Sequence, residues 1–295
     1  MQLILPKPGH YLVAVSGGID SVCLLDILAS NPNYQLTVAH FDHGIRPDSL
    51  LDQIFTHQLA KSYNLPFLSD SVNLGPEASE ALARNARYGF LKRAMEQTKA
   101  AAILTAHHQD DRLETLIINL VRGTGRLGVS SIGETYEIKR PLLNVRKDEL
   151  RHYAQIHKLS WREDTSNNDQ KYLRNYIRHQ VIPKISSQDR TRLVKLMDRQ
   201  LILNEKIDNL VSQLLNQDDL RRLSMRHLSN LSYLESKELI AQWLRLNHLP
   251  GFNQLTIERL TLAAKTKRPG TRIDVYGKTS AKVEKDFLAL IDSER

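Results

Sequence analysis

The sequence predicts an α/β fold, in which a doubly wound parallel sheet is followed by a smaller, mainly helical region. Two observations predict it. Strand-like runs and helix-like segments alternate along the first part of the chain. The strand-like runs are also continuously apolar, as in parallel strands that are buried on both faces. The predicted strands cover residues 11–15, 36–41, 66–72 and 101–106, and the predicted helices cover residues 21–30, 48–63, 79–98 and 110–121.

The alternation stops after Pro141, and the rest of the chain is predicted to be mostly helical. A domain boundary is predicted near residue 190, so that residues 1–190 and 191–295 form separate domains. We expect helices over residues 146–157, 171–181, 188–215 and within 220–265, and a β-hairpin of residues 272–276 and 281–290 around Gly277.

Composition excludes several classes of protein. A hydrophobic content of 41% and a charged content of 25% are typical of a soluble globular protein. No apolar run approaches the roughly 20 residues of a membrane span, and two prolines interrupt the first ten residues, so we expect neither membrane contact nor a signal peptide. The one cysteine, Cys23, favours the cytoplasm, and its place on an apolar helix face predicts a core residue.

The formal net charge of +8 is unevenly distributed. Residues 139–199 hold 15 Lys and Arg against 7 Asp and Glu, so this one stretch carries an excess equal to that of the whole chain. Such a stretch is typical of a protein that binds a polyanion such as nucleic acid. The alternative is a solvated charged surface, but the arginines at helical spacing favour nucleic acid.

The stretch from Tyr11 to Ser21 predicts an anion-binding site. It reads YLVAVSGGIDS: an apolar run, two glycines and the start of an apolar helix pattern. Backbone N–H groups of a tight turn and of a helix's first turn converge there, and the helix dipole favours negative charge. Gly17 and Gly18 let a phosphate approach the backbone, and the hydroxyls of Ser16 and Ser21 are further donors.

This loop differs from a Walker loop, which needs a lysine on the terminal phosphates. The stretch contains no lysine. We therefore expect backbone and hydroxyl groups to hold the phosphates, with positive charge supplied by Mg2+ and by distant arginines. For the hexapeptide alone, an ordinary strand–turn–helix junction is the alternative interpretation.

Polar clusters follow the other predicted strands, so one edge of the sheet is predicted to form a single site. His40 to Arg46 follows the second strand, and His107 to Glu114 follows the fourth. Asp111 and Glu114 lie three residues apart at a helix start, where paired carboxylates can hold an ammonium group or a metal ion. The histidines and aspartates alone would also fit a dinuclear metal hydrolase, but the glycine turn would then have no role.

Together, these ordered motifs resemble one family, the tRNA(Ile)-lysidine synthetases of the N-type ATP pyrophosphatase (PP-loop) superfamily. The resemblance covers residues 10 to about 183, and the chain resembles the short form of the family. Departures are Arg112, where glutamine is usual, and Ser166, where threonine is usual. The motifs are SGGIDS at 16–21, His40 to Arg46, Glu80 to Tyr88, Ala106 to Thr115, RGTG at 122–125, RPLL at 140–143, EDTSN at 163–167 and Arg174 to Arg178.

The resemblance implies an adenine nucleotide alpha-hydrolase-like fold and an ATP-dependent ligase. Family members attach free L-lysine to C2 of the wobble cytidine in the CAU anticodon of an isoleucine tRNA, through an adenylated cytidine, and release diphosphate and AMP. Residues 1–190 would form the N-type ATP pyrophosphatase catalytic domain and residues 191–295 the tRNA-contacting domain. The implied ligands are ATP, Mg2+, lysine and tRNA(Ile), with no membrane partner, and a homodimer is left open.

The same resemblance implies how ATP is bound. The phosphate loop would hold the β and γ phosphates, His107 would lie beside the nucleotide, and Asp20 would help to place Mg2+. The implied loop residues are Ser16, Gly17, Gly18, Ile19, Asp20 and Ser21.

It also implies the catalytic residues. Arg84 or Arg87, which share one helix face, would balance charge on the α-phosphate. The carboxylates of the fourth helix would hold the lysine ammonium group, and one of them would take its proton. Two further arginines would contact the tRNA backbone or the reacting base. These carboxylates are Asp111 and Glu114, and these arginines are Arg174 and Arg178.

Three alternatives fit less well. The tRNA thiolases of the same superfamily need cysteines for persulfide or iron–sulfur chemistry, which one core-facing Cys23 does not supply. Amide-forming members such as NAD or GMP synthetase lack the basic helical tail. A non-catalytic tRNA-binding protein would not need the complete set of chemically competent residues.

Overall fold

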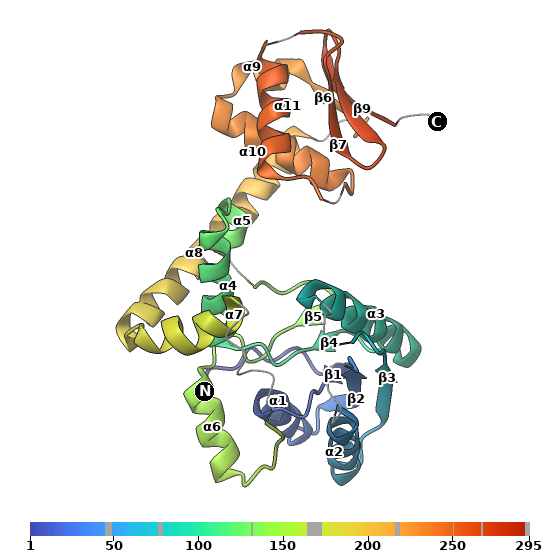
Figure 1. Cartoon of the computed structure of the whole chain (residues 1–295), viewed down its shortest axis with the longest axis vertical. Helices are drawn as coiled ribbons and strands as arrows, with labels where there is room; N and C mark the ends of the chain where they lie inside the picture. The colour runs from blue at the N-terminus through green and yellow to red at the C-terminus, as the bar shows by residue number, and fades with distance from the viewer. Residues whose placement is uncertain are drawn as a thin grey trace. The chain divides into compact units, whose positions relative to one another are not determined.

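The computed structural model describes residues 1–44, 49–75, 79–130, 132–163, 173–215, 219–249, 251–266 and 268–292 (Figure 1). Contacts between residues divide the chain into two compact units, Met1–Leu201 and Ile202–Arg295. The division falls within helix α8 (Ser187–Leu214), the helix that also contains residue 190.

The first unit contains the predicted parallel sheet. Its strands are β1 (Gly9–Ala14), β2 (Tyr34–Asp42), β3 (Phe67–Ser71), β4 (Ile103–Leu104) and β5 (Ile138–Lys139). They are parallel and lie in the order β3-β2-β1-β4-β5. The chain reverses its direction of winding at β1, so the loops after β1 and β4 diverge and leave the crevice in which such sheets bind ligands. Strand β5 was not predicted, because Ile138 lies between charged residues and not within an apolar run.

Helices cover both faces of this sheet, which explains the continuously apolar strands. Figure 1 shows α3 on one side and α1, α2 and α6 on the other. Leu12 of β1 packs with the α3 residues Phe90 and Leu91, whereas its neighbour Val13 packs with Leu24 of α1. The helices of this unit are α1 (Ile19–Ala29), α2 (Ser49–Ser62), α3 (Glu80–Thr98), α4 (Gln109–Val121), α5 (Arg126–Val129), α6 (Lys147–Ile156) and α7 (Leu173–Tyr176).

Helix α7 continues into a π-helical turn, Ile177–Val181, and a 3-10 turn, Ile182–Lys184. Helix α7 and the π-helical turn lie within the helix predicted over residues 171–181, and the 3-10 turn follows it. Its apolar side chains pack against α4 and the first part of α8, through Ile177, Ile182, Leu113, Leu116, Val194 and Met197. The packing holds the segment's arginines beside α4.

Asp26 links α1 to α2 and α6. Its side chain is largely buried, and its two carboxylate oxygens accept hydrogen bonds of 2.6 Å from the hydroxyls of Tyr63 and Tyr153. Burial and the carboxylate both raise the pKa of each tyrosine, so both hydroxyls stay protonated donors. This network holds α6, which contributes to the site below, against α1.

Replacing Asp26 by Asn should destabilise the protein by about 2–3 kcal/mol, because two hydrogen bonds to a buried charged group are weakened. Urea unfolding measures the difference. The control is Asp70→Asn, since the ion pair of Asp70 with Arg93 is exposed and is expected to contribute less than about 1 kcal/mol. Equal destabilisation by the two substitutions would contradict the role of Asp26.

The second unit combines helices with a four-stranded antiparallel sheet in the order β6-β9-β8-β7. The predicted hairpin around Gly277 is present as the first pair of strands in this sheet's C-terminal part, residues 272–276 and 279–283. Residues 281–290 are not one strand as predicted, because they are divided between two strands separated by residues 284–286. A further strand, residues 222–224, lies in a stretch predicted to be helical. The elements are β6 (Arg222–Ser224), α9 (Met225–Asn230), α10 (Tyr233–Leu246), α11 (Gln254–Thr266), β7 (Arg272–Tyr276), β8 (Thr279–Val283) and β9 (Phe287–Asp292).

The composition predicted a core position for Cys23 and no membrane span. Cys23 is fully buried in the core of the first unit, and burial raises the pKa of its thiol to about 12, so the prediction of a core residue is confirmed. None of the helices in the described ranges is long and apolar enough to cross a membrane.

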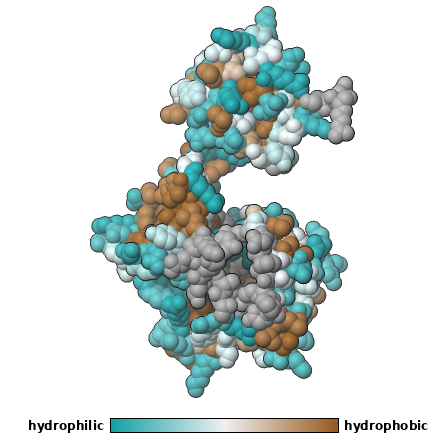
Figure 2. All heavy atoms as spheres, in the orientation of Figure 1, coloured by the Kyte–Doolittle hydropathy of each residue, from teal (hydrophilic) through white to brown (hydrophobic). Residues whose placement is uncertain are grey.

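One surface of the first unit is apolar. Figure 2 shows hydrophobic side chains gathered over α4 and α5, where Leu120, Val121 and Leu127 are exposed. Patches of this kind are typical of surfaces that contact another molecule.

Candidate active site

The phosphate loop connects β1 to α1 as predicted. Gly17 has φ +91°, a conformation that side chains other than glycine's rarely adopt, and Gly18 begins α1 without a side-chain cap. The Ser21 hydroxyl donates to the carbonyl oxygen of Gly18 at 2.8 Å and accepts the backbone N–H of Ser16 at 3.2 Å. The loop is therefore held in shape by its own serines, and the first turn of α1 offers backbone donors to an anion.

A lysine from a distant helix reaches this loop. The Nζ atom of Lys147, in the first turn of α6, lies 2.6 and 2.7 Å from the two carboxylate oxygens of Asp20. On its other side, Asp20 lies 3.5 Å from Nε2 of His108. Burial alone would raise the pKa of Asp20, but His108 and Lys147 outweigh it and hold the pKa well below its usual range. The carboxylate is therefore ionised and paired with the Lys147 ammonium group.

His107 and His108 follow β4, and their pKa values are shifted in opposite directions. Burial, and then nearby arginines including Arg140, lower the pKa of His107 to about 3 against the opposing effect of Asp111, and its Nδ1 lies 2.9 Å from the Thr105 hydroxyl. For His108, burial is outweighed by two carboxylates, Asp111 and Asp20, so its pKa is raised. His107 is therefore a neutral imidazole at physiological pH.

Acid should destabilise the protein through His107. Between about pH 6.5 and 3 the unfolded chain binds a proton at this residue and the folded protein does not, so stability falls as pH falls, by at most about 1.4 kcal/mol per pH unit. Urea unfolding near neutral pH and near pH 5 tests this. The His107→Gln variant should lose less stability than the unsubstituted protein over that range, and equal losses would contradict the prediction.

The predicted carboxylates and arginines form one ion-pair cluster. Glu114 is 1% exposed, and its oxygens accept hydrogen bonds from Arg178 Nε at 2.6 Å and Arg174 Nε at 3.1 Å. Arg178 Nη2 also lies 3.3 Å from Asp111 Oδ1. Asp111 caps α4 by accepting the backbone N–H of His108 at 2.9 Å. Residues assigned separately to lysine and to tRNA thus lie in direct contact.

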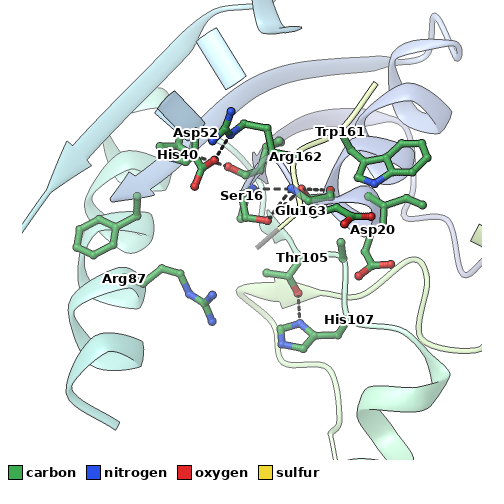
Figure 3. Close-up of a pocket in the computed structure, with 18 of the residues that line it drawn as sticks. Ser16, Asp20, His40, Asp52, Arg87, Thr105, His107, Trp161, Arg162 and Glu163 are labelled. Atoms are coloured by element: carbon green, nitrogen blue, oxygen red, sulfur yellow. Dashed lines mark hydrogen bonds and ion pairs between the residues drawn. The ribbon is translucent and has the colours of Figure 1, made fainter. Parts of the chain in front are cut away.

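Asp111 and Arg178 of this cluster line a cavity of about 860 Å3 at the carboxyl edge of the sheet, a size suited to a nucleotide, whereas Glu114 and Arg174 do not line it. Figure 3 shows His107 and Thr105 across the cavity from Arg162 and Asp52, with Arg87 extending toward it from α3. Among the predicted residues, the cavity wall includes Ser16, Gly18, Ile19, Asp20, Ser21, Arg87, His107, Asp111 and Arg178.

The two arginines of α3 are placed differently. Arg87 lines the cavity, and burial together with neighbouring cations lowers its pKa. Arg84 is exposed, and its guanidinium lies 4.8 Å from the centre of the Tyr88 ring. Of the pair, Arg87 is therefore the one positioned to face a ligand in the cavity.

Sequence reasoning missed several residues of the site, of which Lys147 and Arg162 contact the phosphate loop. Lys147 pairs with Asp20 across 127 positions of the chain. Arg162 donates its backbone N–H to the Gly17 carbonyl at 3.0 Å, and its side chain pairs with buried Asp52 from α2. Neither residue lies near the loop in sequence. The only local signal was that Lys147 lies at a helix start, where the helix dipole disfavours a cation.

The loop fits a nucleotide-bound Mg2+. In the described ranges, no group of three or more His, Cys, Asp or Glu side chains is arranged to hold a metal ion. Mg2+ at phosphates needs no such cage, because one or two carboxylates, phosphate oxygens and waters complete its coordination. Asp20 supplies a carboxylate at the cavity wall.

Some sequence motifs fall outside the described residues. These are Ile45 and Arg46 at the end of the second motif, and residues 164–172, which contain Ser166 and most of the EDTSN motif.

The fold and the loop define a PP-loop ATP-binding protein, and residues 3–185 match the PP-loop domain family. A solved structure with the same fold is the U34-tRNA thiolase NcsA from Methanococcus maripaludis, with a TM-score of 0.56 over 67% of this chain and 74% of that chain. Its sequence identity is 16%, so the similarity concerns the fold alone.

Curated relatives identify the branch within this class. The tRNA(Ile)-lysidine synthase of Francisella tularensis subsp. holarctica is 32% identical over 284 residues, covering 91% of this chain and 70% of the relative. That of Thermotoga sp. is 38% identical over 190 residues, covering 61% and 46%. That of Legionella pneumophila is 40% identical over 180 residues, covering 58% and 41%. The chain belongs to the tRNA(Ile)-lysidine synthase family, and the resemblance seen in the motifs is confirmed.

Proposed function

We propose that this protein forms lysidine on an isoleucine tRNA with a CAU anticodon, using ATP and free lysine. The observation that carries the proposal is that one cavity joins the phosphate loop to Asp111 and Arg178. An anion-binding loop, a carboxylate for an amine and an arginine for RNA are the three groups that the reaction requires. Family membership supports the same function.

The first step consumes ATP. The cytosine O2 attacks the α-phosphate, the bond between the α-phosphorus and the bridging oxygen breaks, and diphosphate leaves. Backbone N–H groups of Gly17, Gly18 and the first turn of α1 hold the β and γ phosphates. Arg87 faces the cavity and stabilises negative charge that develops on the α-phosphate, and Arg84 is the second candidate for this role. His107, which is neutral, lies beside the nucleotide as a hydrogen-bonding group.

The second step consumes lysine. Its ε-amine attacks C2 of the adenylated cytidine, and the bond from C2 to the AMP oxygen breaks. The attacking amine must first lose a proton, since the protonated form is not a nucleophile, and the Asp111 carboxylate accepts it. Asp111 lines the cavity and contacts the lysine ammonium group directly. Glu114 accepts hydrogen bonds from Arg174 and Arg178, so a direct contact with lysine would require one of these bonds to break. We therefore assign Glu114 mainly to holding these arginines.

The remaining groups bind RNA and metal. Arg174 and Arg178 contact the tRNA backbone or the reacting base, and the basic stretch of residues 139–199 adds attraction for the polyanion. Asp20 and phosphate oxygens would hold Mg2+, which would supply positive charge at the phosphates. The helices and sheet of residues 202–295 contact other parts of the tRNA. We place the enzyme in the cytoplasm and leave a homodimer open.

Sulfur transfer, the chemistry named for the structural neighbour, fits this chain less well. Cys23 is the one cysteine of the sequence, and its thiol is buried with a pKa raised to about 12. A nucleophilic thiolate is therefore disfavoured at this position.

The test is label transfer. The protein is incubated with ATP, Mg2+, radiolabelled lysine and either the isoleucine tRNA bearing a CAU anticodon or the elongator methionine tRNA. Label should enter only the isoleucine tRNA, with one AMP released for each lysine incorporated. Label in the methionine tRNA, or in neither, would contradict the proposal.

A further inference from the structure

The phosphate loop carries a negatively charged side chain, Asp20, and a lysine from a helix distant in sequence pairs with it. Asp20 places an ionised carboxylate in the first turn of α1, where the phosphates are expected to bind. Like charges at close range disfavour binding, and the loop itself contains no lysine. The cation nearest to Asp20 comes from α6, whose residue Lys147 holds both of its oxygens.

Helix α6 presents a basic face to the same cavity. Lys147, Arg151 and Gln155 are spaced four residues apart, so they lie along one side of α6, and all three line the cavity. Lys147 also lies at the positive end of its helix, a position that is unfavourable for a cation. Its pairing with Asp20 offsets this cost and keeps the ammonium group beside the loop.

We propose that Lys147, assisted by Arg151, contacts the β- and γ-phosphates of ATP and the diphosphate that leaves. The inference rests on the proposed use of ATP at this loop. The ammonium group lies next to the loop before the nucleotide enters, and its flexible side chain exchanges the Asp20 carboxylate for phosphate oxygens. Lys147 thereby supplies the charge that a Walker lysine supplies from within its own loop.

The basic face explains how the leaving group is stabilised. Breaking the bond to the α-phosphorus places new negative charge on the diphosphate that leaves. A cation that contacts the oxygens of this diphosphate stabilises the transition state more than the bound ATP and so lowers the activation barrier. AMP keeps only the α-phosphate, which lies away from this contact. Lys147 should therefore discriminate between diphosphate and AMP.

The test measures binding of diphosphate, ATP and AMP by calorimetry, with Mg2+ and without tRNA or lysine. Lys147→Met should weaken diphosphate and ATP by about tenfold or more, and change AMP by less than about twofold. Lys147→Arg should retain most of the affinity, and Arg151→Met should weaken diphosphate by a smaller factor. The control is Lys61→Met, an exposed position on α2 outside the cavity, which should change nothing.

A second comparison separates phosphate contact from a structural pairing with Asp20. If Lys147 only neutralises Asp20, removing both charges in the Asp20→Asn, Lys147→Met double variant should restore the diphosphate affinity of the Asp20→Asn variant. If Lys147 contacts phosphate, the double variant should stay about tenfold weaker than Asp20→Asn alone. Thermal unfolding establishes that each variant is folded.

Three outcomes would overturn the inference: unchanged diphosphate binding in Lys147→Met, an equal loss of AMP and diphosphate binding, or full recovery in the double variant. A protein that binds ATP and diphosphate as described but forms no lysidine would contradict the proposed function and still support this inference. A protein that binds neither nucleotide nor diphosphate would overturn both.

Discussion

Replacing Asp111 by Asn should reduce lysidine formation at low lysine concentration by about 100-fold or more, while ATP binding changes little. Asparagine keeps an oxygen that can accept the His108 backbone N–H, so the start of α4 is preserved. What is lost is the negative charge that lines the cavity and that we propose as the partner of the lysine ammonium group. Removing one partner of a largely desolvated charge pair typically costs 2–5 kcal/mol, which spans this factor.

The measurement is the rate of labelled lysine incorporation as a function of lysine concentration, with saturating ATP and tRNA. The matched control is Asp110→Asn. Asp110 is the preceding residue in the same helical turn, but its carboxylate faces Arg190 at 3.5 Å and does not line the cavity. The Asp110→Asn substitution should leave the KM for lysine nearly unchanged. An Asp111→Asn variant with an ordinary KM and kcat would remove Asp111 from the lysine site.

Replacing Glu114 by Gln should destabilise the protein by about 3 kcal/mol, the largest stability effect expected in the site. The glutamine has the same shape but no charge, and it leaves two arginines packed against α4 without their shared carboxylate. Because the arginine side chains are 25% and 32% exposed, water can reach them, which keeps the loss at the lower end of the range for a broken buried pair.

Urea unfolding measures this effect. The control is Glu137→Gln, since the 2.7 Å ion pair of Glu137 with Lys92 joins two side chains that are about half exposed and should contribute less than about 1 kcal/mol. If Glu114→Gln unfolds like the control, the cluster does not hold the segment with Arg174 and Arg178 in place.

The parallel sheet was predictable because its pattern is local. Strands β1 and β2 are buried on both faces and therefore read as continuous apolar runs. The second hairpin of the C-terminal sheet, formed by β8 and β9, was not predictable from the sequence. Its turn consists of Glu284, Lys285 and Asp286. It contains neither glycine nor proline, so residues 281–290 resemble one strand.

Prediction of the site residues was limited in the same way, to groups that lie close together in the sequence. Motif spacing identified the phosphate loop, His107 and the α4 carboxylates, because each set lies within one short segment. Spacing along the chain contains no information on which segments meet. The pairing of Glu114 with Arg174 and Arg178, and that of Asp20 with Lys147, span 60 residues or more and follow from tertiary packing.

The hydrogen bond from the Arg162 backbone to Gly17 affects when, during synthesis of the chain, the phosphate loop can reach its final conformation. The phosphate loop is complete in sequence by residue 21, but Gly17 is held by the backbone of Arg162, and Asp20 and Asp26 are held by Lys147 and Tyr153. During synthesis, these partners leave the ribosome more than 120 residues after the loop. Contacts of such long sequence separation form slowly. The phosphate loop is therefore among the first parts of the chain to be translated, but the contacts that hold it cannot all form until Arg162 has been made, after more than half of the chain.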